Sequence, residues 1–311
     1  RDGHEVWVFD NLDLGHAAAV PGDRLIVGDL ADPRALEAAL RVEPIDAVMH
    51  FAAFASVPES VGDPAKYYRN NVVGTLNLLD AMRATGVKRL VFSSTAAVYG
   101  IPETMPIRED APKEPINPYG FTKLAMERAL ADYALAYSFG TATLRYFNAC
   151  GASDQAEIGE DHTPETHLIP LILQVALGHR EAISIFGTDY PTPDGTCIRD
   201  YIHVDDLADA HIRVLERIEP GKSLVYNVAT GQGYSVREVL DAARRVTGHP
   251  IPAVERPRRP GDPPVLIASP VAIQRDLGWK PRYVEIEAII ASAWRWHSRH
   301  PQGYRDRAIH S

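Results

Sequence analysis

The sequence predicts an α/β protein with a doubly wound parallel sheet, followed by a smaller α+β lobe. In the first 148 residues, short apolar runs alternate with longer amphipathic stretches, and such alternation produces a parallel sheet with helices on both faces. The second half loses this alternation and contains proline-rich stretches at 191–195 and 250–264. A length of 311 residues suits about two domains. We therefore divide the chain into 1–148 and 149–311, and we expect some segments of the second part to return to the first.

Five apolar runs rich in Val, Ile and Phe predict the strands of the sheet. A strand that is covered on both faces has a continuous apolar sequence rather than an alternating one. The predicted strands are 5–10, 24–30, 46–53, 89–95 and 141–148.

Three stretches between these runs predict helices. The first begins at Asp32 and Pro33, because an aspartate caps a helix well and proline suits its first position. The second spans 65–84 and ends at Gly86, a common residue after a helix C-terminus. The third spans 118–138.

Composition excludes several classes of protein. The 32 basic and 41 acidic side chains give a net charge of −9, and without a dense basic run the chain is a poor candidate for binding duplex nucleic acid. No apolar run approaches the ~18 residues of a membrane span. Cys150 and Cys197 are too few for a disulfide framework, so we expect a cytoplasmic protein. The 12 histidines show no spacing that predicts a metal site.

Asp10 ends the first predicted strand, and its position is informative. In dinucleotide-binding folds, an acidic residue that ends the second strand binds ribose hydroxyls about 20 residues after a glycine-rich turn. Only nine residues precede Asp10. If Asp10 has this role, we expect a first strand, its glycine loop and most of a first helix upstream of residue 1. The alternative is that Asp10 caps a loop.

Tyr119 and Lys123 are the strongest candidates for catalytic chemistry. They lie four residues apart at the start of a predicted helix and therefore share a face. An ammonium group beside a phenol lowers the phenol pKa and makes a general base usable near neutral pH. The preceding strand ends in Ser93-Ser94-Thr95, where parallel sheets place ligands. Thr95 would bond a substrate hydroxyl or the Tyr119 oxygen; the alternatives are a surface Tyr–Lys pair and a Thr95 that only satisfies backbone.

Together these residues resemble the extended short-chain dehydrogenase/reductase superfamily and, within it, the UDP-glucose (UDP-galactose) 4-epimerases. The later shared segments, in their order along the chain, are specific to 4-epimerase-like members. The resemblance covers nearly the whole chain, through residues 10–12, 28–30, 51–53, 70–75, 93–100, 118–123, 144–148, 185–190, 194–196, 199–204 and 258–262.

The resemblance implies a Rossmann-type domain with NAD as its cofactor. Asp10 would bind the adenosine ribose, and its charge would disfavour the extra phosphate of NADP. Lys123 would bond the nicotinamide ribose, and Tyr119, Lys123 and Thr95 would be the catalytic residues. The implied cofactor-binding residues are Asp10, Asn11, Asp29, Leu30, Phe51, Ala52, Ala53, Asn71, Ser93, Tyr119, Lys123 and Phe147.

The resemblance also implies a UDP-sugar substrate held by the second lobe. Arg199 and Arg259 would pair with the diphosphate, for which the guanidinium fork is suited. Taken alone, Ile185 and Phe186 are also typical of a core. The implied substrate-binding residues are Thr95, Tyr119, Asn148, Leu168, Ile185, Phe186, Arg199, Tyr201, Arg259 and Asp262. A homodimer through a bundle of the helices at 65–84 and 118–138 is implied as well.

The implied reaction is inversion at C4 of UDP-galactose or UDP-glucose. Tyr119 would take the 4-hydroxyl proton while hydride passes to NAD, and hydride would return to the other face of the sugar. Ala96 and Ala97 stand where sugar 4,6-dehydratases carry Asp-Glu, which disfavours dehydration. Leu266 is intermediate between the Tyr and Cys common at its position, so UDP-N-acetylglucosamine and UDP-xylose remain alternative substrates. A non-catalytic UDP-sugar- or NAD-binding protein is the alternative from another class.

Overall fold

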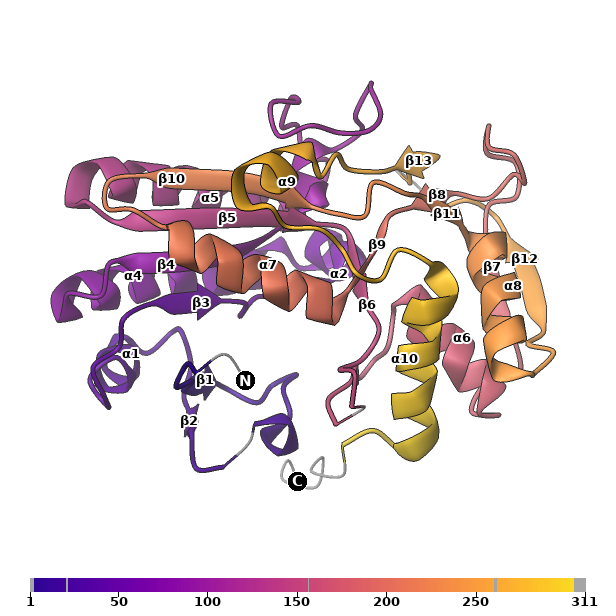
Figure 1. The fold of residues 1–311 in the computed structure, drawn as a ribbon, viewed down its shortest axis with the longest axis horizontal. Helices are drawn as coiled ribbons and strands as arrows, with labels where there is room; N and C mark the ends of the chain where they lie inside the picture. The colour runs from indigo at the N-terminus through magenta and orange to yellow at the C-terminus, as the bar shows by residue number, and fades with distance from the viewer. Residues whose placement is uncertain (1–2, 21, 156, 260–261, 305–311) are drawn as a thin grey trace.

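The computed structural model describes residues 3–20, 22–155, 157–259 and 262–304. Its main sheet has four strands in the order β10-β5-β4-β3 (Figure 1), and all three pairings are parallel. The predicted α/β fold with a parallel central sheet is confirmed, and β4 has the predicted bounds. The strands are β3 (Val48–His50), β4 (Arg89–Thr95), β5 (Gly140–Tyr146) and β10 (Ser223–Val228).

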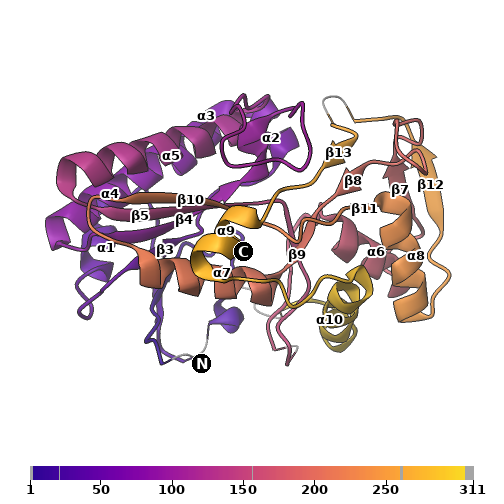
Figure 2. The ribbon, with the colours of Figure 1, turned by 45° about the horizontal axis from the view of Figure 1, so that its top comes forward.

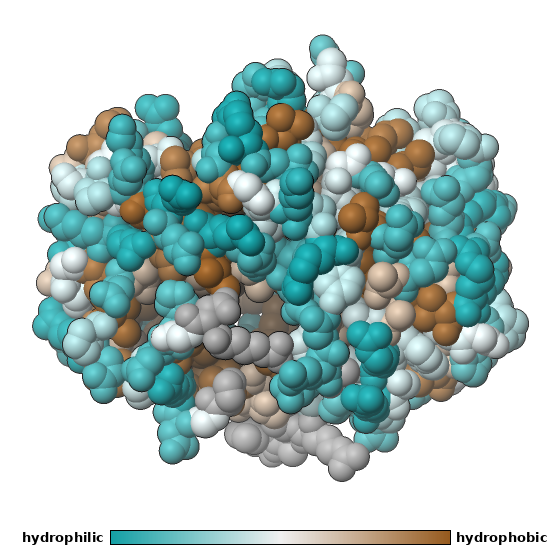
Figure 3. Space-filling view, in the orientation of Figure 1, coloured by the Kyte–Doolittle hydropathy of each residue, from teal (hydrophilic) through white to brown (hydrophobic). Residues whose placement is uncertain are grey.

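The first two predicted strands form a separate pair. β1 (Val8–Asp10) and β2 (Leu25–Val27) make a two-stranded parallel sheet. Within the described residues, β1 pairs only with β2 and β3 only with β4, so the sheet is in two parts. Figure 3 shows this face of the molecule hollowed near the centre of the view, where hydrophobic side chains are visible. The strand expected upstream of residue 1 stays a prediction.

Helices cover both faces of the main sheet. Leu90 and Phe92 of β4 pack in one core with α1 (Pro33–Ala39), α4 (Gly74–Thr85) and α5 (Pro118–Tyr137). Val91 points to the opposite face, as alternation along a strand requires, and packs with α7 (Val204–Arg217) and α9 (Val271–Leu277). The sheet is therefore doubly wound.

Local signals in the sequence account for most helix ends. Asp32 caps α1 by accepting from the N–H groups of Arg34 at 2.9 Å and Ala35 at 3.2 Å. α4 ends at Gly86, whose φ of 82° favours glycine.

The helix predicted at 65–84 is divided into three segments. These are α3 (Pro64–Tyr67), a π-helical segment η2 (Tyr68–Val73) and α4 (Gly74–Thr85). The short helix α2 (Val57–Gly62), which the sequence did not predict, precedes them. Its cap is Ser56, which accepts from the Glu59 N–H at 3.3 Å.

The second lobe lies beside the main sheet in Figures 1 and 2. Its core joins α6 (Leu168–Ala176), α8 (Val236–Thr247) and α10 (Ile286–Arg299). The remaining elements are η1 (Ala17–Ala19), η3 (Ala96–Tyr99), β6 (Asn148–Cys150), β7 (Ile183–Phe186), β8 (Ile198–Arg199), β9 (Tyr201–His203), β11 (Tyr234–Ser235), β12 (Ala253–Arg256) and β13 (Val265–Leu266).

Three segments of the second half pack against the first. β10 pairs with β5, and α7 and α9 lie on the main sheet. We keep the division at residue 148 as a proposal. In it, these three segments of the second part pack on the first part. Among the described helices, none has both the length and the apolar character that a membrane span needs.

Candidate active site

The first turn of α5 carries Tyr119 and is held close to the end of β4. Asn117 caps the helix by accepting from the Gly120 N–H at 2.8 Å, and Pro118 occupies the first helical position. A Cβ atom at Gly120 would lie 2.6 Å from the Ala97 carbonyl oxygen. Glycine therefore allows α5 to approach η3, which directly follows Thr95.

The Thr95 side chain lies beside the Tyr119 phenol and acts on its pKa. The Thr95 oxygen also accepts from the Ala97 N–H at 3.1 Å, so it contacts both the phenol and the backbone. Burial raises the pKa of Tyr119 above its ordinary value of 10.0, while the neighbouring Thr95 side chain opposes this shift. The predicted lowering of the Tyr119 pKa by Lys123 is wrong, because the Lys123 ammonium points to a backbone carbonyl instead.

Lys123 is buried, with 4% of its surface exposed. Its Nζ donates to the Ser93 carbonyl oxygen at 2.8 Å and lies 4.9 Å from the centre of the Phe92 ring. Burial lowers the pKa of Lys123 to about 8, against the opposing charge of Glu127. Burial and, second to it, the positive charge of Lys123 lower the pKa of His50 to about 3. Lys123 thus places a buried amine beside the end of β4.

A buried polar network underlies these residues, and the sequence did not predict it. Glu127, four residues after Lys123, accepts from Ser94 Oγ at 2.5 Å and from Arg145 Nη2 at 2.6 Å. Arg145 Nη1 also donates to Tyr99 Oη at 2.8 Å. Tyr99 donates in turn to Asn227 Oδ1 at 2.7 Å. The network joins β4, β5, α5 and β10 below the site, and the i, i+4 spacing of Lys123 and Glu127 is the signal that could have revealed it.

Three predicted cofactor residues, Asp10, Asn11 and Asp29, lie at or just after the ends of β1 and β2. Asp10 Oδ1 accepts from the Leu12 N–H at 2.7 Å, and Asn11 Nδ2 donates to Asp29 Oδ2 at 2.9 Å. The Ala31 N–H and Asn11 lower the pKa of Asp29. Leu30 differs from the other three, because its side chain is buried in the core beneath α1 and α4.

The turn after β3 carries the next predicted contacts. Phe51 is 54% exposed, Ala52 is also exposed, and Ala53 is partly buried. Asn71 holds this turn: its Oδ1 accepts from the Phe54 N–H at 2.9 Å and its Nδ2 donates to the Phe54 carbonyl at 3.0 Å. These bonds give Asn71 a positioning role for the turn.

Ser93 and Phe147 are the last two predicted cofactor contacts. The Ser93 hydroxyl is bonded to the Tyr146 hydroxyl. Phe147 is partly buried and packs with Leu266 against the small core around Val98 and Tyr99. Both therefore lie beside the C-terminal ends of β4 and β5.

The residues present fit NAD. Asp10 provides a carboxylate at a strand end, and the exposed turn after β3 provides small residues for close approach. An ammonium group has three donors. Among the described residues, Lys123 uses one of them, toward Ser93, so two N–H groups are available for ribose hydroxyls.

The predicted diphosphate residues gather around Cys197. The charges of Arg199, Asp262 and Arg259 all act on its thiol, although burial is the main reason that its pKa is raised. Arg199 Nη2 donates to Asp262 Oδ1 at 2.9 Å, and the Arg259 guanidinium lies 4.1 Å from the centre of the Phe186 ring. The structure therefore brings both predicted arginines into one region of the second lobe.

The other predicted substrate residues are less exposed. Ile185 and Tyr201 are buried in the core of the second lobe, and Leu168 packs against that core. Ile185 therefore lies in a core, which was the alternative to a role in binding substrate. Asn148 Nδ2 donates to the Asp200 carbonyl at 2.9 Å.

Asp200 is an anchor that the sequence did not single out. Its buried carboxylate accepts from the Thr230 N–H and hydroxyl, at 3.0 and 2.8 Å, and from the Gly231 N–H at 3.0 Å. Burial raises the pKa of Asp200 to about 6. These bonds fix the corner between Arg199 and Tyr201 against the loop after β10.

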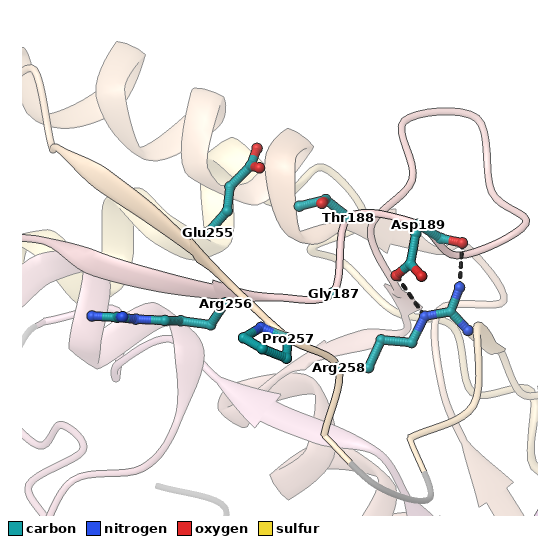
Figure 4. A pocket seen from close by; sticks show the side chains of 7 residues that line it. All are labelled: Gly187, Thr188, Asp189, Glu255, Arg256, Pro257 and Arg258. Atoms are coloured by element: carbon teal, nitrogen blue, oxygen red, sulfur yellow. Dashed lines mark hydrogen bonds and ion pairs between the residues drawn. The ribbon is translucent and has the colours of Figure 1, made fainter.

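An open pocket of about 560 Å³ lies beside β7 and β12 (Figure 4). Arg258 and Asp189 form an ion pair at its rim, with 2.6 Å between Nε and Oδ1. Its lining residues are Gly187, Thr188, Asp189, Glu255, Arg256, Pro257 and Arg258. Phe186 and Arg259 adjoin it in sequence, but Tyr119 and Lys123 do not line it, so the pocket is not the catalytic centre.

Comparison with known families places this arrangement in a class. Residues 1–229 match the model of the NAD dependent epimerase/dehydratase family. That match covers more than half of the chain, and the chain belongs to this family.

Individual relatives agree with the family. A UDP-glucose 4-epimerase of Lacticaseibacillus casei is 52% identical over 307 residues, which are 98% of this chain and 93% of the relative. A solved UDP-glucose 4-epimerase is 50% identical, covers 97% of this chain and 92% of its own, and has a TM-score of 0.94. The enzyme of Bifidobacterium longum, solved with NAD+ and UDP, is 39% identical, with coverages of 97% and 93% and a TM-score of 0.93.

Proposed function

We propose that this protein interconverts UDP-galactose and UDP-glucose by transient oxidation and re-reduction at C4 of the sugar. The observation that carries the proposal is the contact of the Tyr119 phenol with Thr95, beside buried Lys123 at the end of β4. The relatives named UDP-glucose 4-epimerase, at about half identity over nearly the full chain, support it.

Each catalytic residue has a task that follows from its position. When bound, NAD supplies the hydride acceptor and donor for C4 and a positive charge near the phenol. Tyr119 takes the proton of the 4-hydroxyl and later returns it. Thr95, whose side chain lies beside the Tyr119 phenol, orients that hydroxyl. Lys123 holds the cofactor ribose with the donors that Ser93 leaves available.

The second lobe retains the nucleotide while the sugar turns. Arg199 and Arg259 hold the diphosphate, which suits guanidinium groups. The partner of Arg199 is Asp262, 2.9 Å away, and this pair orients Arg199. Because both arginines act on UDP rather than on the sugar, the 4-keto sugar is free to present its other face.

Two positions bear on the choice of reaction and sugar. Ala96 and Ala97 follow Thr95 and offer no acid or base for eliminating water. Leu266 pairs with Arg199 between β13 and β8 and packs near Phe147. Leu266 therefore adjoins Arg199 and shares a small core with Phe147, and its size sets how readily N-acetylated UDP-sugars or UDP-xylose enter.

We also propose that two copies pair through the outer faces of η2 and α5. Tyr68 and Val73 on η2 and Phe121 on α5 are exposed apolar side chains, and the rings of Tyr68 and Phe121 are 6.3 Å apart. A second copy would bury this apolar surface. The cytoplasm suits the protein, because both cysteines are free and buried.

The test is an NMR assay of UDP-galactose with the purified protein and without added NAD. Formation of UDP-glucose supports both the reaction and a retained cofactor. If no UDP-sugar is converted even with NAD added, the epimerase proposal fails and a non-catalytic binding protein is favoured. Conversion that is confined to N-acetylated sugars or UDP-xylose would redirect the proposal to those substrates.

A further inference from the structure

The connection between β6 and α6 contains a compact group of potential metal ligands. It comprises Glu160, His162, Glu165 and His167, and one ligand atom from each lies within 4.8 Å of all the others. The sequence spacing predicted no metal site, yet the connection folds so that four side chains from eight consecutive residues converge.

The separations of the ligand atoms suit a tetrahedral ion. His167 Nδ1 lies 2.9 Å from Glu160 Oε1 and 2.9 Å from Glu165 Oε1. His162 Nδ1 lies 3.4 Å from Glu160 Oε1 and 3.5 Å from Glu165 Oε2. Zinc binds such atoms at about 2.0–2.1 Å, which places neighbouring ligands of a tetrahedron about 3.3 Å apart. These four histidine–glutamate separations lie on either side of that value, and the other two pairs of ligand atoms lie within 4.8 Å.

The charge and burial of Glu160 and Glu165 also favour a bound cation. The side chain of Glu165 is 5% exposed and that of Glu160 is 15% exposed. Two carboxylates this close and this buried need compensating positive charge. One divalent ion neutralises both, while the histidines bind it as neutral ligands. Two protonated histidines are the competing source of the charge.

The donor set selects the metal. Calcium and magnesium prefer oxygen ligands throughout, whereas zinc accepts both imidazole and carboxylate. Four protein ligands complete a tetrahedron and leave no position for a substrate, as in structural zinc sites.

We propose that Glu160, His162, Glu165 and His167 bind one zinc ion in a structural site. The ion fixes the connection between β6 and α6. His167 is the residue immediately before α6, and neighbouring Gly159 packs so closely on Trp296 of α10 that a Cβ atom would clash with the indole ring. Zinc would thereby tie the start of α6 to its place beside α10. This inference is independent of the proposed function.

The test uses the full chain without an affinity tag, stripped with EDTA and titrated first with Co²⁺ and then with Zn²⁺. We expect one ion per chain, the intense visible absorption of tetrahedral Co²⁺, and its loss when Zn²⁺ displaces the cobalt. The double variant His162→Gln/His167→Gln should weaken binding by more than about 100-fold, beyond the loss typical of an outer-shell partner. The matched control is His179→Gln/His249→Gln, which removes two exposed histidines elsewhere and should bind as the parent does.

Thermal unfolding gives an independent readout. EDTA should lower the Tm of the parent and of the control, and it should leave the double variant unchanged. If the double variant does not fold, Glu165→Gln, which preserves the side-chain volume, replaces it with the same expectations. A parent chain that binds no Co²⁺ or Zn²⁺, an octahedral cobalt spectrum, or undiminished binding by the cluster variants would overturn the proposal in favour of a histidine–glutamate ion-pair cluster.

Discussion

The buried ammonium of Lys123 donates to the carbonyl oxygen of Ser93, 2.8 Å away, and so joins α5 to the end of β4. One helical turn earlier, Tyr119 meets Thr95, which ends the same strand. The three proposed catalytic residues therefore stand on two packed elements rather than on a loop. Such support holds a site within the small tolerances that chemistry requires, and single substitutions there should change the reaction more than the fold.

Removing the Tyr119 hydroxyl should abolish most activity. We expect Tyr119→Phe to lower kcat by about 10²- to 10⁴-fold, the range for a lost general base, with little change in the free energy of unfolding. The measurement is the rate of UDP-galactose conversion by NMR. Tyr137→Phe on the same helix serves as the control and should keep the parental rate. A loss below tenfold in Tyr119→Phe would show that another group moves the proton.

Lys123 should matter chiefly for holding NAD. Because a charge-assisted hydrogen bond is worth about 1.5–3 kcal/mol, we expect Lys123→Met to weaken NAD binding by roughly 10- to 100-fold. Cofactor content after purification and NAD titration by fluorescence measure the effect. The control is exposed Lys88→Met. Parental NAD affinity in Lys123→Met would remove Lys123 from the cofactor site.

The ion pair below the site should dominate local stability. Arg145→Met leaves Glu127 as an unpaired buried carboxylate, which should lower the free energy of unfolding by about 3–5 kcal/mol. Arg128→Met breaks an exposed pair with Asp132 on the same helix and should cost less than about 1 kcal/mol. Urea denaturation compares the two variants. Equal effects would mean that the Arg145–Glu127 pair adds nothing beyond a surface pair.

Asp200 should make stability depend on pH. Its folded-state pKa of about 6 lies above the ordinary 3.8, so the folded protein binds this proton more tightly than the unfolded chain does. The resulting stabilisation is complete below pH 3.8 and is lost as the pH rises through 6. The free energy of unfolding of the parent minus that of Asp200→Asn should therefore fall by roughly 2.4 kcal/mol between pH 4 and 7. Urea denaturation across this range tests it, and a constant difference would place the pKa of Asp200 at its ordinary value.

Leu266 should set the size of sugar that the site accepts. Leu266→Ala removes side-chain volume beside Phe147 and Arg199, so kcat/KM for UDP-N-acetylglucosamine relative to UDP-glucose should rise about 10-fold or more, while Leu266→Tyr should lower the same ratio. Neighbouring Val265→Ala is the control. A ratio that follows neither substitution would show that the sugar does not approach Leu266.

Short-range signals in the sequence predicted much of the fold. Asp32 and Gly86 mark helix ends through their own backbone and side-chain bonds, and the apolar run of β4 gives its full length. The π-helical segment Tyr68–Val73 interrupts an otherwise regular helical pattern, and no local signal marks it.

The long-range features of the site could not be predicted in the same way. Glu127 and Arg145 are 18 residues apart and meet only because α5 packs on β5. The pKa of Tyr119 depends chiefly on its burial. The spacing of residues along one helix cannot predict that burial. His203 caps α7, since its ring accepts from the Asp205 N–H.

The most direct test of the central claim follows the hydrogen at C4. UDP-galactose that carries deuterium at C4 is incubated with the protein in ordinary water, and the UDP-glucose formed is analysed by NMR and mass spectrometry. Oxidation and re-reduction within one site predict that the deuterium remains on C4 of the product. Loss of the deuterium to water would contradict hydride return to the same carbon and with it the proposed mechanism.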